Sequence, residues 1–97
     1  MLPNVLYFFP VPPSILWISP NHTTELGNDV TLVCRVIGRP TPRVVWKKNG
    51  RVLQDSSSTG NITLANISPE DGGSYECSAI NIVANDTRTT LLTVVGW

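Results

Sequence analysis

The chain has 97 residues and a mass of 10.6 kDa, enough for one domain and too little for two. Seven Lys and Arg residues balance seven Asp and Glu residues, so no basic surface for nucleic acid or anionic lipid is predicted. Hydrophobic residues make up 41% of the chain and charged residues 14%, which is typical of a packed globular unit. No apolar run approaches the roughly 18 residues that cross a membrane.

The first twelve residues combine aromatic side chains with prolines. They lack a basic residue ahead of the apolar stretch, and prolines interrupt that stretch, so the segment does not fit a secretory signal peptide. We expect residues 1–12 to be a linker or a vector-derived remnant, and residues 13–97 to form the domain. Residues 14–19 then predict a strand that is apolar on both faces and stops at Pro20.

Alternating polarity predicts a second strand from Asp29 onward, because successive strand residues point to opposite faces of a sheet. Its apolar residues share one face: Val30, Leu32, Cys34 and Val36. A loop with two prolines follows over residues 38–42, and proline cannot donate the hydrogen bonds of a sheet. The next predicted strand spans residues 43–48 and places Val44 and Trp46 on the same face.

Asn49-Gly50 predicts a two-residue hairpin turn, because both residues tolerate a positive φ, with a return strand over residues 51–53. A polar loop over residues 54–60 precedes an inward-facing apolar set: Ile62, Leu64 and Ile67. Turn residues over 68–73 precede two further apolar faces: Tyr75, Cys77 and Ala79, then Leu92 and Val94. We find no helical period, and seven or eight short strands separated by turns indicate a β-sandwich.

The two cysteines, Cys34 and Cys77, lie 43 positions apart, and neither has another cysteine nearby. This spacing excludes a CxxC redox motif and a cysteine-rich zinc site. The residues alone leave two interpretations open, a pair of buried free thiols or one disulfide. A disulfide that closes a loop of this size contributes roughly 4 kcal/mol to the free energy of unfolding.

Cys34 is followed twelve positions later by Trp46, and residues 71–77 read Asp-Gly-Gly-Ser-Tyr-Glu-Cys. Residues 38–50 read Gly-x-Pro-x-Pro-x-Val-x-Trp-x-Lys-Asn-Gly. In this order, the elements resemble an immunoglobulin domain of the intermediate (I-set) type, and the match runs over residues 12–95. The resemblance implies an all-β, immunoglobulin-like sandwich of two antiparallel sheets that a Cys34–Cys77 disulfide joins.

The resemblance also assigns structural roles to single residues. Trp46 is expected to pack on the disulfide, and Tyr75 stands where the family's tyrosine corner bonds its hydroxyl to the upstream backbone. Two further residues complete the expected structural core: Leu64, which faces inward, and Asp71, which begins a tight turn. The cysteine spacing is short for the family, so strand D is expected to be short or absent. Ala84 replaces a common glycine of the last hairpin, and Asn85 is expected to supply the positive φ there.

Four Asn-x-Ser/Thr sequons make N-glycosylation a candidate modification: Asn21, Asn61, Asn66 and Asn85. The alternative is that these are incidental polar residues of turns and strands. The resemblance places the first three on one sheet and leaves the sheet of Trp46, Cys77 and Leu92 poor in sequons. The outward residues of that second sheet form the candidate binding face: Val45, Lys47, Ser78, Ile80 and Leu91. The alternative is that isolated apolar residues are normal on a protein surface.

Nothing in the sequence predicts catalysis. His22 is the single histidine, no phosphate-binding loop or metal-ligand spacing occurs, and the neighbouring carboxylates Glu70 and Asp71 diverge in a turn. We therefore expect no enzyme activity, no cofactor and no metal site.

The resemblance implies an extracellular, non-catalytic module for protein recognition or adhesion within a larger cell-surface or secreted multidomain protein. Its expected partners are another protein and adjacent domains of the same chain, without nucleic acid and without membrane insertion. Trp17 and Trp97 are expected to contact such neighbouring domains. The alternative for Trp17 is that it covers the edge of the sandwich. The alternative function is an intracellular structural repeat, similar to the I-set domains of giant muscle proteins, in which the cysteines stay reduced.

Overall fold

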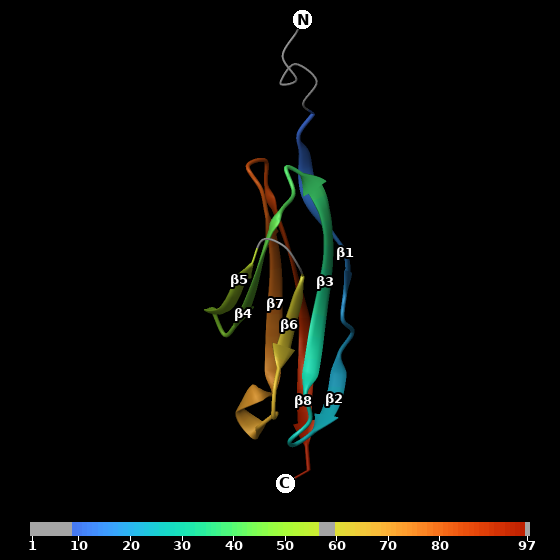
Figure 1. Ribbon diagram of the computed structural model, residues 1–97, viewed down its shortest axis with the longest axis vertical. Coiled ribbons are helices and arrows are strands. Elements are labelled where there is room, and N and C mark those ends of the chain that lie inside the picture. Colours follow the sequence, from blue (N-terminus) through green and yellow to red (C-terminus); the bar gives the residue numbers. More distant parts are fainter. Residues whose placement is uncertain (1–8, 57–59, 97) are drawn as a thin grey trace, which may run out of the picture.

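The computed structural model describes residues 9–56 and 60–96, and these form two sheets packed face to face (Figure 1). The strands in chain order are β1 (Val11–Ile18), β2 (His22–Glu25), β3 (Val30–Arg39), β4 (Arg43–Lys48), β5 (Arg51–Ser56), β6 (Asn61–Leu64), β7 (Gly73–Ile80) and β8 (Asn85–Val95). A single 3₁₀ turn, η2 (Pro69–Asp71), joins β6 to β7. The predicted all-β sandwich is confirmed.

One sheet has three strands in the order β1-β3-β6, and the other has five in the order β2-β8-β7-β4-β5. The pairings within both sheets are antiparallel, as expected, with one exception in the described residues, because β2 pairs with β8 in parallel. Between β1 and β2 the chain passes from one sheet to the other without reversing its direction (Figure 1). The first predicted strand, residues 14–19, corresponds to β1, and β2 in the other sheet is a strand that the sequence did not predict.

The core lies between the sheets and follows the period-two pattern of the sequence. The inward-facing side chains are buried: Ile15, Val30, Leu32, Cys34, Val44, Trp46, Ile62, Ile67, Tyr75, Cys77, Ala79, Leu92 and Val94. Val36 and Leu64 are partly buried and pack against this core. Burying a large apolar side chain contributes about 1.5–3 kcal/mol, so the alternation of the strands accounts for which side of each strand faces inward.

The predicted Asn49-Gly50 turn is confirmed, with φ of 52° and 78° at its two residues. The return strand is longer than expected and extends as β5 to Ser56, with an irregularity in its pairing beside Trp46. In the three-stranded sheet β6 is an edge strand, and no further strand pairs with it within residues 9–56 and 60–96. This agrees with the short or absent strand D that the cysteine spacing predicts.

The β7–β8 turn differs from its prediction. Asn85 does not have a positive φ. Instead the side chain of Asn81 shapes the turn, because its Oδ1 accepts hydrogen bonds from the backbone N–H of Val83 at 2.9 Å and of Ala84 at 3.3 Å. The backbone therefore turns without a left-handed residue. The Nδ2 of Asn81 also donates to the backbone oxygens of Val11 and Pro40, at 2.9 and 3.1 Å, which ties three segments together at this end of the domain.

The domain boundary expected at residues 12 and 13 falls inside β1, which begins at Val11. Most of the expected linker, residues 1–8, lies outside the described residues, as does Trp97.

Candidate functional site

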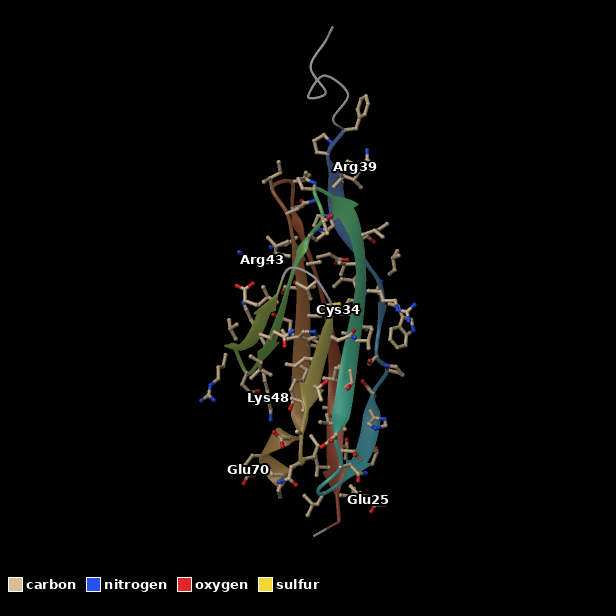
Figure 2. The ribbon with its side chains drawn as sticks, viewed as in Figure 1. Glu25, Cys34, Arg39, Arg43, Lys48 and Glu70 are labelled. Atoms are coloured by element: carbon tan, nitrogen blue, oxygen red, sulfur yellow. A yellow bond between two sulfur atoms is a disulfide. The ribbon has the colours of Figure 1, made fainter. Side chains whose placement is uncertain are left out.

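A disulfide and a tryptophan lie in the core of the sandwich, and Figure 2 labels one of the bonded cysteines, Cys34. Cys34 on β3 and Cys77 on β7 are bonded, with their Cα atoms 6.6 Å apart, so the bridge joins the two sheets. Of the two interpretations that the cysteines allowed, the structure has the disulfide. Trp46 is fully buried, and its Nε1 donates a hydrogen bond to the backbone oxygen of Gly60 at 3.1 Å.

Gly60 approaches β3 so closely that no other residue fits there. The backbone N–H of Cys34 donates to the oxygen of Gly60 at 2.8 Å. A Cβ atom at position 60 would lie 1.6 Å from the backbone oxygen of Cys34. This glycine was not singled out in the sequence, because only the packed structure brings it against the disulfide.

Tyr75 forms the expected corner, since its hydroxyl donates a hydrogen bond to the backbone oxygen of Asp71. The Asp71 carboxylate accepts hydrogen bonds from the backbone N–H of Ser68, at 2.7 Å, and from its hydroxyl, which holds η2 together. Lys48 lies 5.3 Å from the centre of the Tyr75 ring and donates to the backbone oxygen of Glu70 (Figure 2). These contacts stabilise the fold.

Two groups of this corner titrate away from their ordinary values. Burial raises the pKa of the Tyr75 hydroxyl, and the negative charge of Asp71 raises it further. A hydrogen bond from the Ser68 side chain lowers the pKa of the exposed Glu70 carboxyl. Neither shift brings a proton donor or acceptor near neutral pH, so the corner is not suited to acid–base catalysis.

The four sequon asparagines are all exposed, but their distribution differs from the prediction. Asn61 lies on β6, and Asn66 follows that strand. Asn21 was expected on the same sheet, which is wrong, because its Oδ1 accepts a hydrogen bond from the backbone N–H of Leu91 on β8, at 3.0 Å. Asn85 begins β8. Two of the four sequons therefore border the five-stranded sheet, which was expected to be poor in sequons, and their occupancy stays a prediction.

The candidate binding face on the five-stranded sheet is mostly covered. Val45 and Ser78 were expected to be exposed, which is wrong, since their exposed fractions are 4% and 8%. Lys47 and Ile80 are half-buried, and Leu91 is exposed. Two contacts lie next to Val45 and Ser78. Asp55, which pairs with Val45, forms an ion pair of 3.2 Å with Arg43, and Ser78 shares a 3.1 Å hydrogen bond with Thr87. Both residues also lie on strands inside the sheet, where neighbours stand on either side.

The outer face of the three-stranded sheet is a second open apolar surface. Leu16 is 58% exposed, Trp17 45% and Ile37 50%. The Arg35 guanidinium lies 5.8 Å from the centre of the Trp17 ring. Trp17 is thus presented on a sheet face together with an arginine, rather than covering the edge of the sandwich. The sequence offered one signal for this face, the apolar character of residues 14–19 on both sides of the strand.

The surface of the described residues has shallow hollows and no cluster of side chains that could bind a metal ion. A hollow of about 320 Å³ beside the β4–β5 turn is lined by Lys48, Asn49, Arg51, Leu53 and Glu70. Within residues 9–56 and 60–96, no three His, Cys, Asp or Glu side chains are grouped so that they could hold a metal ion. None of the helical structure in the same residues has the length and apolar character needed to cross a membrane.

A disulfide-linked sandwich with a buried tryptophan and a tyrosine corner defines an immunoglobulin-like domain. Comparison with known families agrees, because a family model described as immunoglobulin domain matches residues 12–81. The chain belongs to the immunoglobulin domain family. Its I-set subtype stays a prediction of the sequence.

Relatives of this chain include proteins of several kinds. It is 33% identical to vascular endothelial growth factor receptor 2 of Rattus norvegicus over 82 residues, which cover 78% of this chain and 6% of the receptor. It is 37% identical to hemicentin-1 of Mus musculus over 92 residues, or 87% of this chain and 2% of hemicentin-1. A solved complex of titin M10 with an obscurin-like 1 immunoglobulin domain is similar with a TM-score of 0.82 and 29% identity, covering 90% of this chain and 96% of that one. The chain thus spans only a small fraction of the length of the receptor and of hemicentin-1.

Proposed function

We propose that this chain is a non-catalytic, extracellular module for protein recognition or adhesion, and that it works within a larger cell-surface or secreted protein. The observation that carries the proposal is the disulfide between Cys34 and Cys77 at the centre of the core. Disulfides persist in oxidising compartments and are rare in the cytosol. The receptor and hemicentin relatives support the same assignment, since the chain resembles one small part of each.

The mechanism is recognition by the outer surface of a rigid sandwich. The disulfide and the packed core hold the two sheets in a fixed relation, so side chains on their outer faces are presented without a large entropic cost on binding. The exposed sequons suit a glycoprotein, because a sugar on an exposed asparagine leaves the core undisturbed.

The test uses the full-length protein in its own cells. Thiols are blocked before lysis, and peptides are then analysed by mass spectrometry for a Cys34–Cys77 cross-link and for glycan on the four sequons. Surface labelling of intact cells provides an independent readout. The proposal expects the cross-link, glycan on at least one sequon, and labelling from outside the cell. Blocked cysteines at both positions together with bare sequons would contradict it.

A second candidate function is an intracellular structural repeat, which the likeness to titin M10 favours, since titin is intracellular. In that case the same experiment finds two reduced cysteines, no glycan and no labelling of intact cells.

A further inference from the structure

We propose that the outer face of the three-stranded sheet is the recognition surface, and that it binds a protein segment presenting carboxylates beside apolar side chains. We call this surface the Arg–Trp face and define it by six residues: Val11, Leu16, Trp17, Arg35, Ile37 and Arg39. The inference rests on the proposed function as a recognition module. It goes further by naming the face and the chemistry of the partner.

The pairing of β1 with β3 brings these residues together. Trp17 stands opposite Arg35, and Val11 stands opposite Arg39. Residues directly opposite each other on neighbouring strands share one face of a sheet. On β3 the alternate residue Cys34 is buried in the core. Arg35, Ile37 and Arg39 therefore point away from the core, and the β1 side chains lie beside them.

Apolar exposure on this face exceeds that on the face predicted from the sequence. Leu16, Trp17 and Ile37 are each about half exposed, at 58%, 45% and 50%, and Val11 is 39% exposed. On the five-stranded sheet Val45 is 4% exposed, whereas Leu91 and Val52 are 46% and 51% exposed. Tryptophan and arginine are enriched among the residues that dominate the binding energy of protein interfaces, and the Arg–Trp face carries both in contact.

The charges on this face indicate what the partner carries. None of the acidic residues of the chain lies on a strand of this sheet, β1, β3 or β6. The seven acidic residues are Glu25, Asp29, Asp55, Glu70, Asp71, Glu76 and Asp86. Asp86 is the acid that reaches β1, and its Oδ2 accepts a hydrogen bond from the backbone N–H of Ile15 at 2.8 Å. Within the described part of the chain, neither Arg35 nor Arg39 forms a salt bridge. Both guanidinium groups are exposed and free to bind carboxylates of a partner, which they do with paired, charge-assisted hydrogen bonds.

The same charges disfavour a second copy of this chain as the partner. In a symmetric dimer the same patch of both copies meets across the two-fold axis. That arrangement would bring Arg35 and Arg39 of each copy together, and like charges across an interface cost free energy. The Arg–Trp face therefore fits a different, acidic protein surface.

Asn61 lies on the β6 side of the same sheet, opposite Val33. Strands within a sheet are about 4.8 Å apart, so β6 and β1 are separated by roughly 10 Å across β3. A glycan on Asn61 would border the Arg–Trp face and limit the approach from that side. Thr63→Ala removes the sequon without changing the face, which allows the sugar and the face to be tested separately.

The experiment is selection of random 12-residue peptides displayed on phage against the immobilised 97-residue chain, at low salt. The selected peptides are then synthesised and measured by calorimetry against four variants. Two change the proposed surface, Arg35→Glu and Trp17→Ser, and two are matched controls elsewhere, Arg51→Glu on β5 and Leu91→Glu on β8. Thermal unfolding of each variant shows that it is folded, which is expected because all four positions are exposed.

The proposal expects peptides that combine Asp or Glu with Leu, Phe or Trp. Arg35→Glu should weaken their binding at least tenfold, Trp17→Ser should also weaken it, and Arg51→Glu and Leu91→Glu should change it less than twofold. Raising the salt concentration should weaken binding further. Peptides without acidic residues, failure to select any peptide, or full binding to Arg35→Glu would each overturn the proposal. Loss of binding in Leu91→Glu alone would leave the chain a recognition module but move the surface to the five-stranded sheet.

Discussion

Thr90 provides a sharp test of the packing inside the sandwich. It lies on β8 opposite Tyr75, and its exposed fraction is 3%. Its Oγ1 has no hydrogen-bond partner among the residues that the structure describes. A buried polar group without a partner costs about 1–3 kcal/mol. Thr90→Val replaces the hydroxyl with a methyl group of similar size and keeps the branched Cβ that suits a strand.

We therefore expect Thr90→Val to raise the free energy of unfolding by about 1 kcal/mol or more. In a domain of this size, about 1 kcal/mol corresponds to a rise in Tm of roughly 4–8 °C. Urea unfolding and differential scanning calorimetry measure the two quantities independently, on oxidised protein at neutral pH.

Thr24→Val is the matched control, because Thr24 is also buried, at 5% exposed, but its Oγ1 accepts a hydrogen bond from Asn28 Nδ2 at 3.5 Å. The control should gain no stability. A loss of stability in Thr90→Val would show that the Thr90 hydroxyl is hydrogen-bonded after all, for example to a buried water. Equal gains in both variants would mean that added hydrophobicity, and not the unpaired hydroxyl, is responsible.

Three further predictions follow from the site. Replacing Cys34 and Cys77 together with alanine should cost roughly 4 kcal/mol in urea unfolding, since the disulfide closes a long loop of the unfolded chain; a loss below about 1 kcal/mol would contradict this account. Burial raises the pKa of Tyr75, so its contribution to stability is fully present below the usual value of about 10 and is lost as the pH rises through the raised folded-state pKa. The Tm measured between pH 8 and 12 should show this decline in the wild type but not in Tyr75→Phe. If the Tm of both proteins depends on pH in the same way, the prediction for Tyr75 is wrong. Asn81→Ala removes hydrogen bonds that join three segments and should lower stability by about 1–3 kcal/mol, with faster amide exchange at Val83; unchanged exchange there would count against the role of this side chain.

Much of the fold was predictable, because it depends on local patterns. The alternation from Val30 to Val36 predicted a strand and its buried side, since the period of a strand is two whatever lies around it. Asn49 and Gly50 predicted their turn, because a positive φ is accessible to few residues. The order of Cys34, Trp46 and Cys77 pointed to the disulfide through its resemblance to a family, although the spacing alone left free thiols open.

The candidate site was less predictable, because it depends on what covers each outer face. Alternation correctly pointed Val45 away from the core, yet Val45 is only 4% exposed, on a strand with a neighbour on either side. Asn21 was expected on the same sheet as the first strand, but the chain changes sheets there, and Asn21 accepts a hydrogen bond from β8.

The sequence by itself determined the class of fold and the inward face of each long strand, since these follow from the pattern of residues along one chain, and its resemblance to a family assigned the tyrosine corner. Only the tertiary structure decided that β2 runs parallel to β8, that Thr90 is buried without a partner, and that Trp17 and Arg35 share an open face. The physical reason is that burial and pairing on the outside of a sheet are set by residues far apart in the chain, which no local pattern records.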